Sequence, residues 1–322
     1  MSELYASITD CDDPVMVNVT SSHSAQIATA NFEVMDTDLD IGSEVEIDLG
    51  YNTPSHHHKL FTGYVKSIDR KEPDRTYQIL ASDTLTRAAD YFIASTNPKL
   101  PFSRSDILLE DLVSELLALA GLTLSGHDDT SFTIGTSSPV EINLTTCLDY
   151  CRYLGNVVTW SLWSDEDGNI YFKNRKPYIM PGDSPTGPTL NTTNTTTAIS
   201  SVNGDSLRNK IVIYGNGDIY AVASAESIYL PADYYKTVVV NCVQLFVTQE
   251  MAQMAADYNL IALNRLTNSM SITAVGNPDY MARDTVIANF PTLGITNIEH
   301  YIYACEHNWS SQGYTTKLEL KV

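Results

Sequence analysis

Three consecutive histidines, His56, His57 and His58, are the residues whose type and spacing most directly suggest chemistry. Imidazole groups bind metals, and they change charge near pH 6.5. Neighbouring side chains of an extended segment point in alternate directions, so three adjacent histidines are a poor site for one metal ion. They do offer flat rings and hydrogen-bonding groups for a polar contact. The alternative interpretation is a solvated loop tip.

The histidines lie in the stretch DLGYNTPSHHHKLFTGYV, between two expected strands. Pro54 biases Thr53 toward an extended conformation. The connection looks longer than the ~2 to 5 residues of a tight hairpin. We therefore expect a long loop in which Tyr51, Asn52 and the three histidines contact a partner. This loop is expected to be mobile in the free protein and ordered in an assembly.

Among the five scattered cysteines, Cys147 and Cys151 are close enough in sequence to share a helix face, with Leu148 and Leu154. Such a pair could be a redox pair or half of a metal site. No second pair of cysteines or histidines at ligand spacing lies nearby. Burial as two small apolar groups is therefore the favoured interpretation. An odd, sparse set of cysteines also does not indicate a disulfide framework.

The sequence lacks the common motifs for phosphate binding, zinc proteases and serine hydrolases. The segment DEDGN, residues 165–169, resembles the start of a calcium loop but lacks the regular spacing and the distal Glu. A hairpin turn explains it better. Carboxylates are numerous, but no pair is singled out for glycoside hydrolysis. We expect no catalytic residue, no cofactor and no metal, and structural roles for His300 and His307.

The composition is that of an acidic globular chain long enough for two or three domains. Of its 322 residues 43% are apolar, and 39 acidic residues against 19 basic ones give a net charge of −20. No cluster of Lys and Arg stands out, which argues against a nucleic-acid-binding surface. The N-terminus has no signal-peptide pattern, and no apolar run reaches the ~18 residues of a membrane span. We expect a soluble protein made in a cytoplasm.

The elements that must position these residues fall into three expected domains. Residues 1–95 alternate apolar and polar residues, as in an antiparallel sheet or barrel with one wet face. Residues 96–205 hold two helices, a hairpin and a Thr- and Pro-rich loop over 180–197. Residues 206–322 return to strands around one helix. The predicted fold class is α+β, mainly β, with two antiparallel β-barrels and a small α/β middle domain.

Helical spacing predicts the ends of the three helices. Ser105 is expected to cap the first, which ends at Gly121. The second, in TTCLDYCRYLG, is expected to end at Gly155. Thr248 is expected to cap the third, in TQEMAQMAADYNLIALNRLTN.

The first and last domains share a pattern of strands. IGSEVEIDLGY, LFTGYVKSI and TYQILAS in the first correspond to MARDTVIANFP, HYIYACEHNW and TTKLELKV in the last. In both, a polar turn opens a strand, a long connection follows and two further strands close the unit. This pattern predicts an internal duplication.

Four stretches, in this order, resemble the baseplate hub proteins of tailed phages and contractile injection systems, the late control protein D family. They are IGSEVEIDLGY…KLFTGYVKSI…YQILASD, LLEDLVSELLALAGL, CLDYCRYLGNVVTWSLWSDEDGNIYFKNR and LRNKIVIYGNG…GNPDYMARDTVIANF…YIYACEHNWSSQGYTTKLELKV. Together they span most of the chain. The histidine-bearing loop and the Thr-rich stretch match no motif of the family.

The resemblance implies a non-enzymatic structural protein of the virion. Proteins of this family form homotrimers in which each chain carries two barrels similar to a tail-tube subunit, so three chains imitate a six-fold ring. One side meets the tail tube protein and the other the spike or tail-tip protein. DNA passes through the bore without specific binding, for which an acidic lining is suited. The expected location is the tail tip or baseplate, after assembly in the host cytoplasm.

Two other classes of function remain open at this point. One is a tail-associated enzyme that degrades cell wall, although the chain has no spare length for a separate catalytic domain. The other is a secreted carbohydrate-binding β protein, against which the absent signal peptide and the two-helix middle section count.

Overall fold

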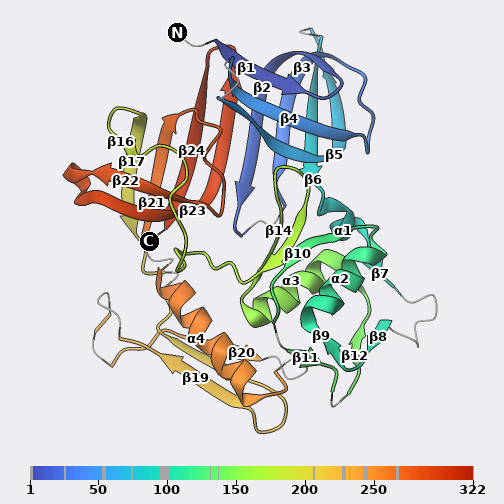
Figure 1. The fold of residues 1–322 in the computed structure, drawn as a ribbon, viewed down its shortest axis with the longest axis vertical. Coiled ribbons are helices and arrows are strands. Elements are labelled where there is room, and N and C mark those ends of the chain that lie inside the picture. Colours follow the sequence, from blue (N-terminus) through green and yellow to red (C-terminus); the bar gives the residue numbers. More distant parts are fainter. Residues whose placement is uncertain are drawn as a thin grey trace.

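The computed structural model describes residues 3–24, 27–52, 56–73, 75–94, 102–130, 132–136, 138–205, 207–226, 230–231, 233–241, 246–265 and 268–321. Strands dominate, with four α-helices gathered away from the largest sheet (Figure 1). The predicted fold class, α+β and mainly β, is confirmed. Among the described helices, none is long and apolar enough to cross a membrane.

The first β unit consists of six antiparallel strands. They are β1 (Leu4–Ile8), β2 (Cys11–Ser22), β3 (Thr29–Thr37), β4 (Glu44–Tyr51), β5 (His57–Lys71) and β6 (Thr76–Asp83). The order across the sheet is β1-β4-β5-β6-β3-β2. Alternate residues such as Val17, Phe32 and Ile47 point into one shared core. Because β2, β3 and β4 all contribute to this core, the sheet curls around it, and Figure 1 shows β4 crossing in front of β2 and β3.

The second β unit is formed by the four C-terminal strands and by two strands, β16 (Leu190–Asn191) and β17 (Thr195–Val202), that lie far before them in sequence. The C-terminal strands are β21 (Asn268–Val275), β22 (Thr285–Phe290), β23 (Ile295–Ser310) and β24 (Gly313–Lys321), with a 3-10 turn at Pro291–Leu293. The order is β22-β23-β24-β21-β17, and β16 pairs with β22 in parallel. The core of this unit includes Ile272, Ala288, Ile302 and Leu318.

The two β units have the same connectivity. The order β4-β5-β6-β3-β2 of the first unit is matched, strand for strand along the chain, by β22-β23-β24-β21-β17 of the second. Corresponding ladders even shift register at the same place. Lys66 is skipped in the ladder of β5 with β6, two residues after Tyr64, the last residue paired with β4. Tyr303 is skipped in the ladder of β23 with β24, two residues after Tyr301, the last paired with β22. The predicted duplication is therefore confirmed in the strand connectivity.

The two β units join in one continuous twelve-stranded sheet (Figure 1). Strand β2 pairs antiparallel with the second half of β23, from Met16 opposite Ser310 to Ser22 opposite Ala304. On the same edge of β23, the first half pairs with β22. One long strand thus holds both units together.

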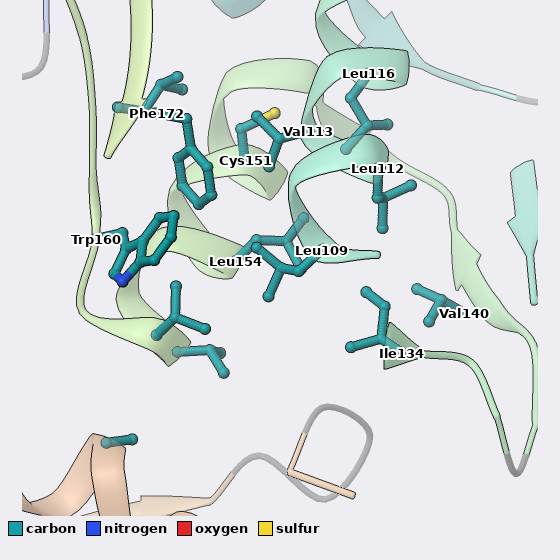
Figure 2. Close-up of a cluster of buried hydrophobic side chains, with 14 of the residues drawn as sticks. Leu109, Leu112, Val113, Leu116, Ile134, Val140, Cys151, Leu154, Trp160 and Phe172 are labelled. Atoms are coloured by element: carbon teal, nitrogen blue, oxygen red, sulfur yellow. The ribbon is translucent and has the colours of Figure 1, made fainter. Parts of the chain in front are cut away.

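The middle unit packs its helices around a large apolar core. Its elements are α1 (Thr86–Asp90), β7 (Phe92–Ile93), β8 (Phe102–Arg104), β9 (Ile107–Leu108), α2 (Leu109–Leu119), β10 (Leu124–His127), β11 (Thr133–Ile134), β12 (Val140–Ile142), β13 (Thr145–Thr146), α3 (Cys147–Val158), β14 (Ser161–Ser164) and β15 (Ile170–Lys173). In Figure 2, Leu112 and Leu116 of α2 and Leu154 of α3 belong to one cluster with Trp160 and Phe172. These side chains recur at helical spacing, which is why α2 and α3 form here.

The structure corrects two of the predicted helix ends. The first of these helices, α2, begins at Leu109 after the short strand β9, so Ser105 is not its cap. Helix α3 continues past Gly155 to Val158, because Gly155 is buried against the backbone of Trp160 and does not terminate the helix. The predicted cap of the last long helix is confirmed, since the N–H of Met251 donates to Oγ1 of Thr248 at 3.2 Å.

The predicted boundary at residue 206 does not coincide with the division of the cores. The strands β18 (Lys210–Tyr214), β19 (Tyr220–Ser224) and β20 (Thr237–Asn241) and the helix α4 (Gln249–Arg265) lie between β17 and β21 in sequence. Their apolar residues, among them Ile211 and Ala252, belong to the core of the middle unit. The second β unit instead starts at β16, within the stretch 180–197 that was expected to be a loop. The duplicated segment is therefore interrupted by an insertion.

Candidate functional site

The histidine segment is not the long loop that was expected. Strand β4 extends to Tyr51, and β5 already includes His57 and His58. Gly50 lies opposite His57 in the ladder, so only residues 52–56 connect the two strands. The predicted loop was too long because it included His57 and His58, whose residue type does not distinguish an exposed strand end from a loop. Within this connection, residues 53–55 lie outside the described residues.

The β4–β5 hairpin end packs against the second β unit. The hydroxyl of Tyr51 donates to the carbonyl oxygen of Gly276 at 3.0 Å. Nε2 of His58 lies 3.1 Å from Oδ1 of Asp279, and both side chains are about half exposed. These contacts tie the hairpin end to the connection between β21 and β22.

The other predicted contact residues face the N-terminal strand or solvent. The ring of His57 lies 4.3 Å, between centroids, from the ring of Tyr5. Asn52 donates from its backbone N–H and its side chain to Glu3. The side chains of Asn52 and His56 are exposed. The structure thus brings all five predicted contact residues to one end of the first unit and leaves part of that end open to solvent.

A buried histidine lies beneath this hairpin end. Nε2 of His307 is 2.9 Å from the carbonyl oxygen of Tyr280, and Nδ1 is 2.7 Å from the hydroxyl of Tyr314. This geometry fits a neutral ring that donates from Nε2 and accepts at Nδ1. Burial lowers the pKa of His307 to about 4. The ring of Tyr314 also contacts that of Tyr51, which links this cluster to the hairpin.

A pocket of about 540 Å³ lies where the three units meet. The first unit contributes residues around Thr62 and Asp83, and the middle unit contributes Trp163 of β14 and Arg175, which follows β15. The second unit contributes residues 281–285. A pocket at an interface between units is a common place for a ligand.

Arg283 is the central residue of this pocket. It is half-buried, donates from Nη2 to the carbonyl oxygen of Ser22 at 2.9 Å, and lies over the ring of Trp163 at 5.3 Å. Its own carbonyl oxygen accepts from the guanidinium of Arg175, which also bonds Asp183 at 2.7 Å. One arginine therefore contacts all three units. Its Nε has no hydrogen-bond partner among the described residues, and water in a polar pocket of this size can supply one.

Three carboxyl groups near the pocket have a raised pKa. Burial raises the pKa of Asp83 to about 7 and also raises those of Glu166 and Asp284. Both oxygens of Asp83 accept backbone hydrogen bonds, from Ala28 at 2.6 Å and from Leu85 at 3.0 Å. Asp284 accepts from the hydroxyl of Thr186 at 3.1 Å. Asp83 and Asp284 thus hold backbone and side chains in place.

The neighbouring histidine is also held by structural contacts. Nδ1 of His23 is 2.7 Å from the hydroxyl of Tyr301, and Nε2 is 3.3 Å from Oγ of Ser161. Burial, followed by the charges of Arg283 and Arg175, lowers the pKa of His23 to about 3. The ring is therefore neutral at pH 7, and it connects the first unit to the other two.

The remaining sequence candidates have structural positions. Cys147 and Cys151 are both buried in the core of the middle unit, as expected. Asp165 accepts from the backbone N–H groups of Asp167 and Asn169, so the DEDGN segment forms the β14–β15 turn. Within the described part of the chain, no cluster of three or more His, Cys, Asp or Glu could hold a metal.

The junction pocket could not be found from the sequence. Its polar residues come from segments far apart in sequence, among them Thr62, Asp83, Asp128 and the stretches 163–166, 173–184 and 281–285. No motif or periodicity connects these segments. The one available signal, a charged residue such as Arg283 amid apolar neighbours, is common on surfaces and identifies no site by itself.

Solved structures that align with this chain include tail proteins. A tail protein from Neisseria meningitidis MC58 aligns with a TM-score of 0.75 at 13% identity, over 99% of this chain and 97% of that one. The 43 kDa tail protein of prophage MuSo2 from Shewanella oneidensis gives 0.71 at 14% identity, over 99% and 97%. At such identities the shared property is the fold, and the predicted resemblance to tail and baseplate hub-type proteins is confirmed at that level.

A third structure extends the comparison to secretion systems. The E. coli c3393 protein, described as a type VI secretion component similar to the phage T4 tail proteins gp27 and gp5, aligns with a TM-score of 0.58. Identity is 10%, over 98% of this chain and 76% of that one. A search of curated proteins found no match. A family model described as YQBQ-like matches residues 17–321, nearly the whole chain, and the chain therefore belongs to the YQBQ-like family.

Proposed function

We propose that this chain is a non-enzymatic structural protein of a phage-type tail. Three copies form a ring at the tail tip or baseplate that adapts the six-fold tail tube protein to a spike or tail-tip protein. The ring is assembled in the host cytoplasm, and DNA passes through its bore. The observation that carries this proposal is the repeated strand order of the two β units. Two similar units per chain give six per trimer, which is the number a six-fold tube requires.

The charge of the chain agrees with this role. A net charge of −20 favours a bore that repels the DNA backbone. The buried junction around Arg283 has a role here as well, because it fixes the middle unit against both β units. A ring element that transmits force from tube to tip needs such a rigid joint.

The mass of the purified protein in solution tests the assembly. We expect three times the 35.6 kDa of one chain by light scattering, and a ring by electron microscopy. A monomer at all concentrations that also fails to bind purified tail tube protein would contradict the proposal.

The hairpin end with Tyr51, Asn52, His56, His57 and His58 is proposed as a contact with the adjoining tail component. Exchange of all three histidines for Ser should leave the trimer intact and weaken docking onto tail tubes. The matched control is His127→Ser, an exposed histidine on the middle unit. If docking of the triple variant equals that of the control, this end is solvated surface.

A second candidate function rests on the raised pKa of Asp83, Glu166 and Asp284, a property shared with acid catalysts. It is a tail-associated enzyme that degrades cell wall. Release of soluble sugars or peptides from purified cell wall, abolished by Glu166→Gln, would support it. We favour the structural role, because the backbone contacts of Asp83 leave neither of its oxygens uncommitted.

A further inference from the structure

The two β units are joined by the pairing of one strand edge from each unit. Because the units are duplicates, the edge that each unit uses at the junction has an equivalent in the other unit. At the junction, β2 supplies one edge and the second half of β23 the other. The strand equivalent to β2 in the second unit is β17, and the strand equivalent to β23 in the first unit is β5.

Both of these equivalent edges lack a strand partner within the described chain. Strand β17 ends the sheet and pairs with β21 alone. On β5, the edge facing β4 is paired through Tyr64, and Val65 bonds the turn at Gly42 and Ser43. Beyond that point, from Ser67 to Lys71, this edge has no ladder partner. In Figure 1 the two edges lie in different β units, β17 at the left and β5 toward the right.

We propose that β17 of one copy pairs antiparallel with the Ser67–Lys71 edge of β5 in a second copy, repeating between chains the β2–β23 pairing seen within the chain. This inference rests on the proposed function and specifies the contact that would close its ring. An unpaired strand edge is a ready template for another strand. The edges differ from each other, so the contact is head-to-tail, and such contacts close into rings when the rotation allows it.

The shifts in the ladders fix the register of this pairing. Val15 is skipped in the β2–β3 ladder, and Thr196 is skipped in the β17–β21 ladder, so these two residues correspond. Asn18 lies three residues after Val15 and Ile199 three residues after Thr196, so Asn18 corresponds to Ile199. Asn308 and Lys71 correspond in the same way, since they follow Tyr303 and Lys66 by five residues. The internal pair Asn18–Asn308 therefore predicts Ile199 opposite Lys71 of the second copy.

The same register places an exposed apolar side chain opposite a half-buried one. Ser21 pairs with Cys305 inside the chain, and the corresponding residues are Val202 and Ile68. Val202 is 58% exposed, while Ile68 packs at the margin of the first core. Opposite residues of an antiparallel pair project to the same face. Pairing would cover Val202 with Ile68 and extend the core across the contact.

Disulfide trapping tests the register directly. In a background with Cys11→Ser and Cys242→Ser, two double variants are made, Ile199→Cys with Lys71→Cys and Val202→Cys with Ile68→Cys. Along an antiparallel ladder, residue pairs alternate between a shorter and a longer Cα separation. The two engineered pairs are three residues apart, so one of them has the shorter separation. Mild oxidation should convert that variant to covalent dimers and closed covalent trimers on a non-reducing gel.

The chain supplies matched controls. Asn18→Cys with Asn308→Cys, and Ser21→Cys with the native Cys305, are the internal equivalents, and the closer of these two pairs should form its disulfide within one chain. Ile199→Cys with Arg70→Cys is displaced by one residue, which turns the side chains to opposite faces, and should stay uncrosslinked.

The outcomes separate this contact from the proposed function. If an internal control forms its disulfide and neither double variant links chains, the edge pairing is wrong, even when light scattering gives a trimer. Dimers from Ile199→Cys alone would also overturn it, because β17 would then pair with its own kind. Covalent products that grow well beyond three chains would support the edge pairing and reject the closed trimeric hub.

Discussion

Acid should destabilise this protein through His307, and the size of the effect follows from its surroundings. In the folded chain the ring is buried, bonded to Tyr280 and Tyr314, and has a pKa of about 4 instead of 6.5. Because the folded pKa is the lower one, the stabilising contribution is complete above pH 6.5. It is lost as the pH falls from 6.5 toward 4, where the unfolded chain binds a proton that the folded chain excludes.

The magnitude can be worked from these two values. One pKa unit corresponds to about 1.4 kcal/mol, so the difference between the folded and unfolded pKa amounts to roughly 3 kcal/mol below pH 4. Between pH 7 and pH 5 the expected loss from His307 alone is about 2 kcal/mol. His23, with its pKa of about 3, adds a loss of the same sign. Asp83, with its pKa raised to about 7, acts in the opposite direction.

A comparison of two variants isolates the contribution of His307. Free energies of unfolding in urea are measured at pH 7, 6 and 5 for the native chain, for His307→Gln and for His127→Gln. The Gln amide can donate to Tyr280 but does not titrate, so His307→Gln should lose about 2 kcal/mol less than the native chain between pH 7 and 5. His127 is exposed, and its variant should follow the native curve. Parallel curves for the native chain and His307→Gln would refute the reasoning.

Two further predictions concern the middle unit. A Cβ on Gly155 would lie 2.9 Å from the carbonyl oxygen of Trp160, so Gly155→Ala should lower the free energy of unfolding in urea by about 1–3 kcal/mol. Gly204→Ala meets no atom within 4 Å and should change it little; equal losses would contradict the packing argument. Burial raises the pKa of Cys147 to about 11 and that of Cys151 further. Neither thiol should react with an aromatic disulfide reagent until the chain unfolds, and rapid labelling of the native protein would be inconsistent with this core.

Sequence patterns predicted most elements because strand alternation and helical spacing report which face is buried. The apolar residues of α2, for example, recur at helical spacing and lie in one core. Patterns failed where a strand end is polar and exposed. His57 and His58 belong to β5, but nothing in their type distinguishes a hairpin end from a loop.

The candidate site required the tertiary structure. Arg283, Asp83 and Arg175 meet only because three units converge, and no local signal encodes such convergence. The five hairpin residues were predicted as a group from their proximity in sequence. Their contacts with Gly276 and Asp279, in the other β unit, were beyond the reach of local patterns.

The polar character of β17 explains why the start of the second β unit was predicted to be a loop. Its sequence, TTTAISSV, lacks the alternation of its counterpart β2, whose Val17 and Val19 are buried. A strand alternates fully only where one of its faces is buried against a core. Most of β17 is exposed, and in the described part of the chain it pairs with β21 alone. Long apolar edges promote uncontrolled association, so a polar edge that keeps two exposed apolar residues, Ile199 and Val202, suits a strand that must stay soluble until one specific partner arrives. The insertion between β17 and β21 separates this strand from its own repeat in sequence, so the pattern that predicted the duplication covered only β22 to β24 of the second unit.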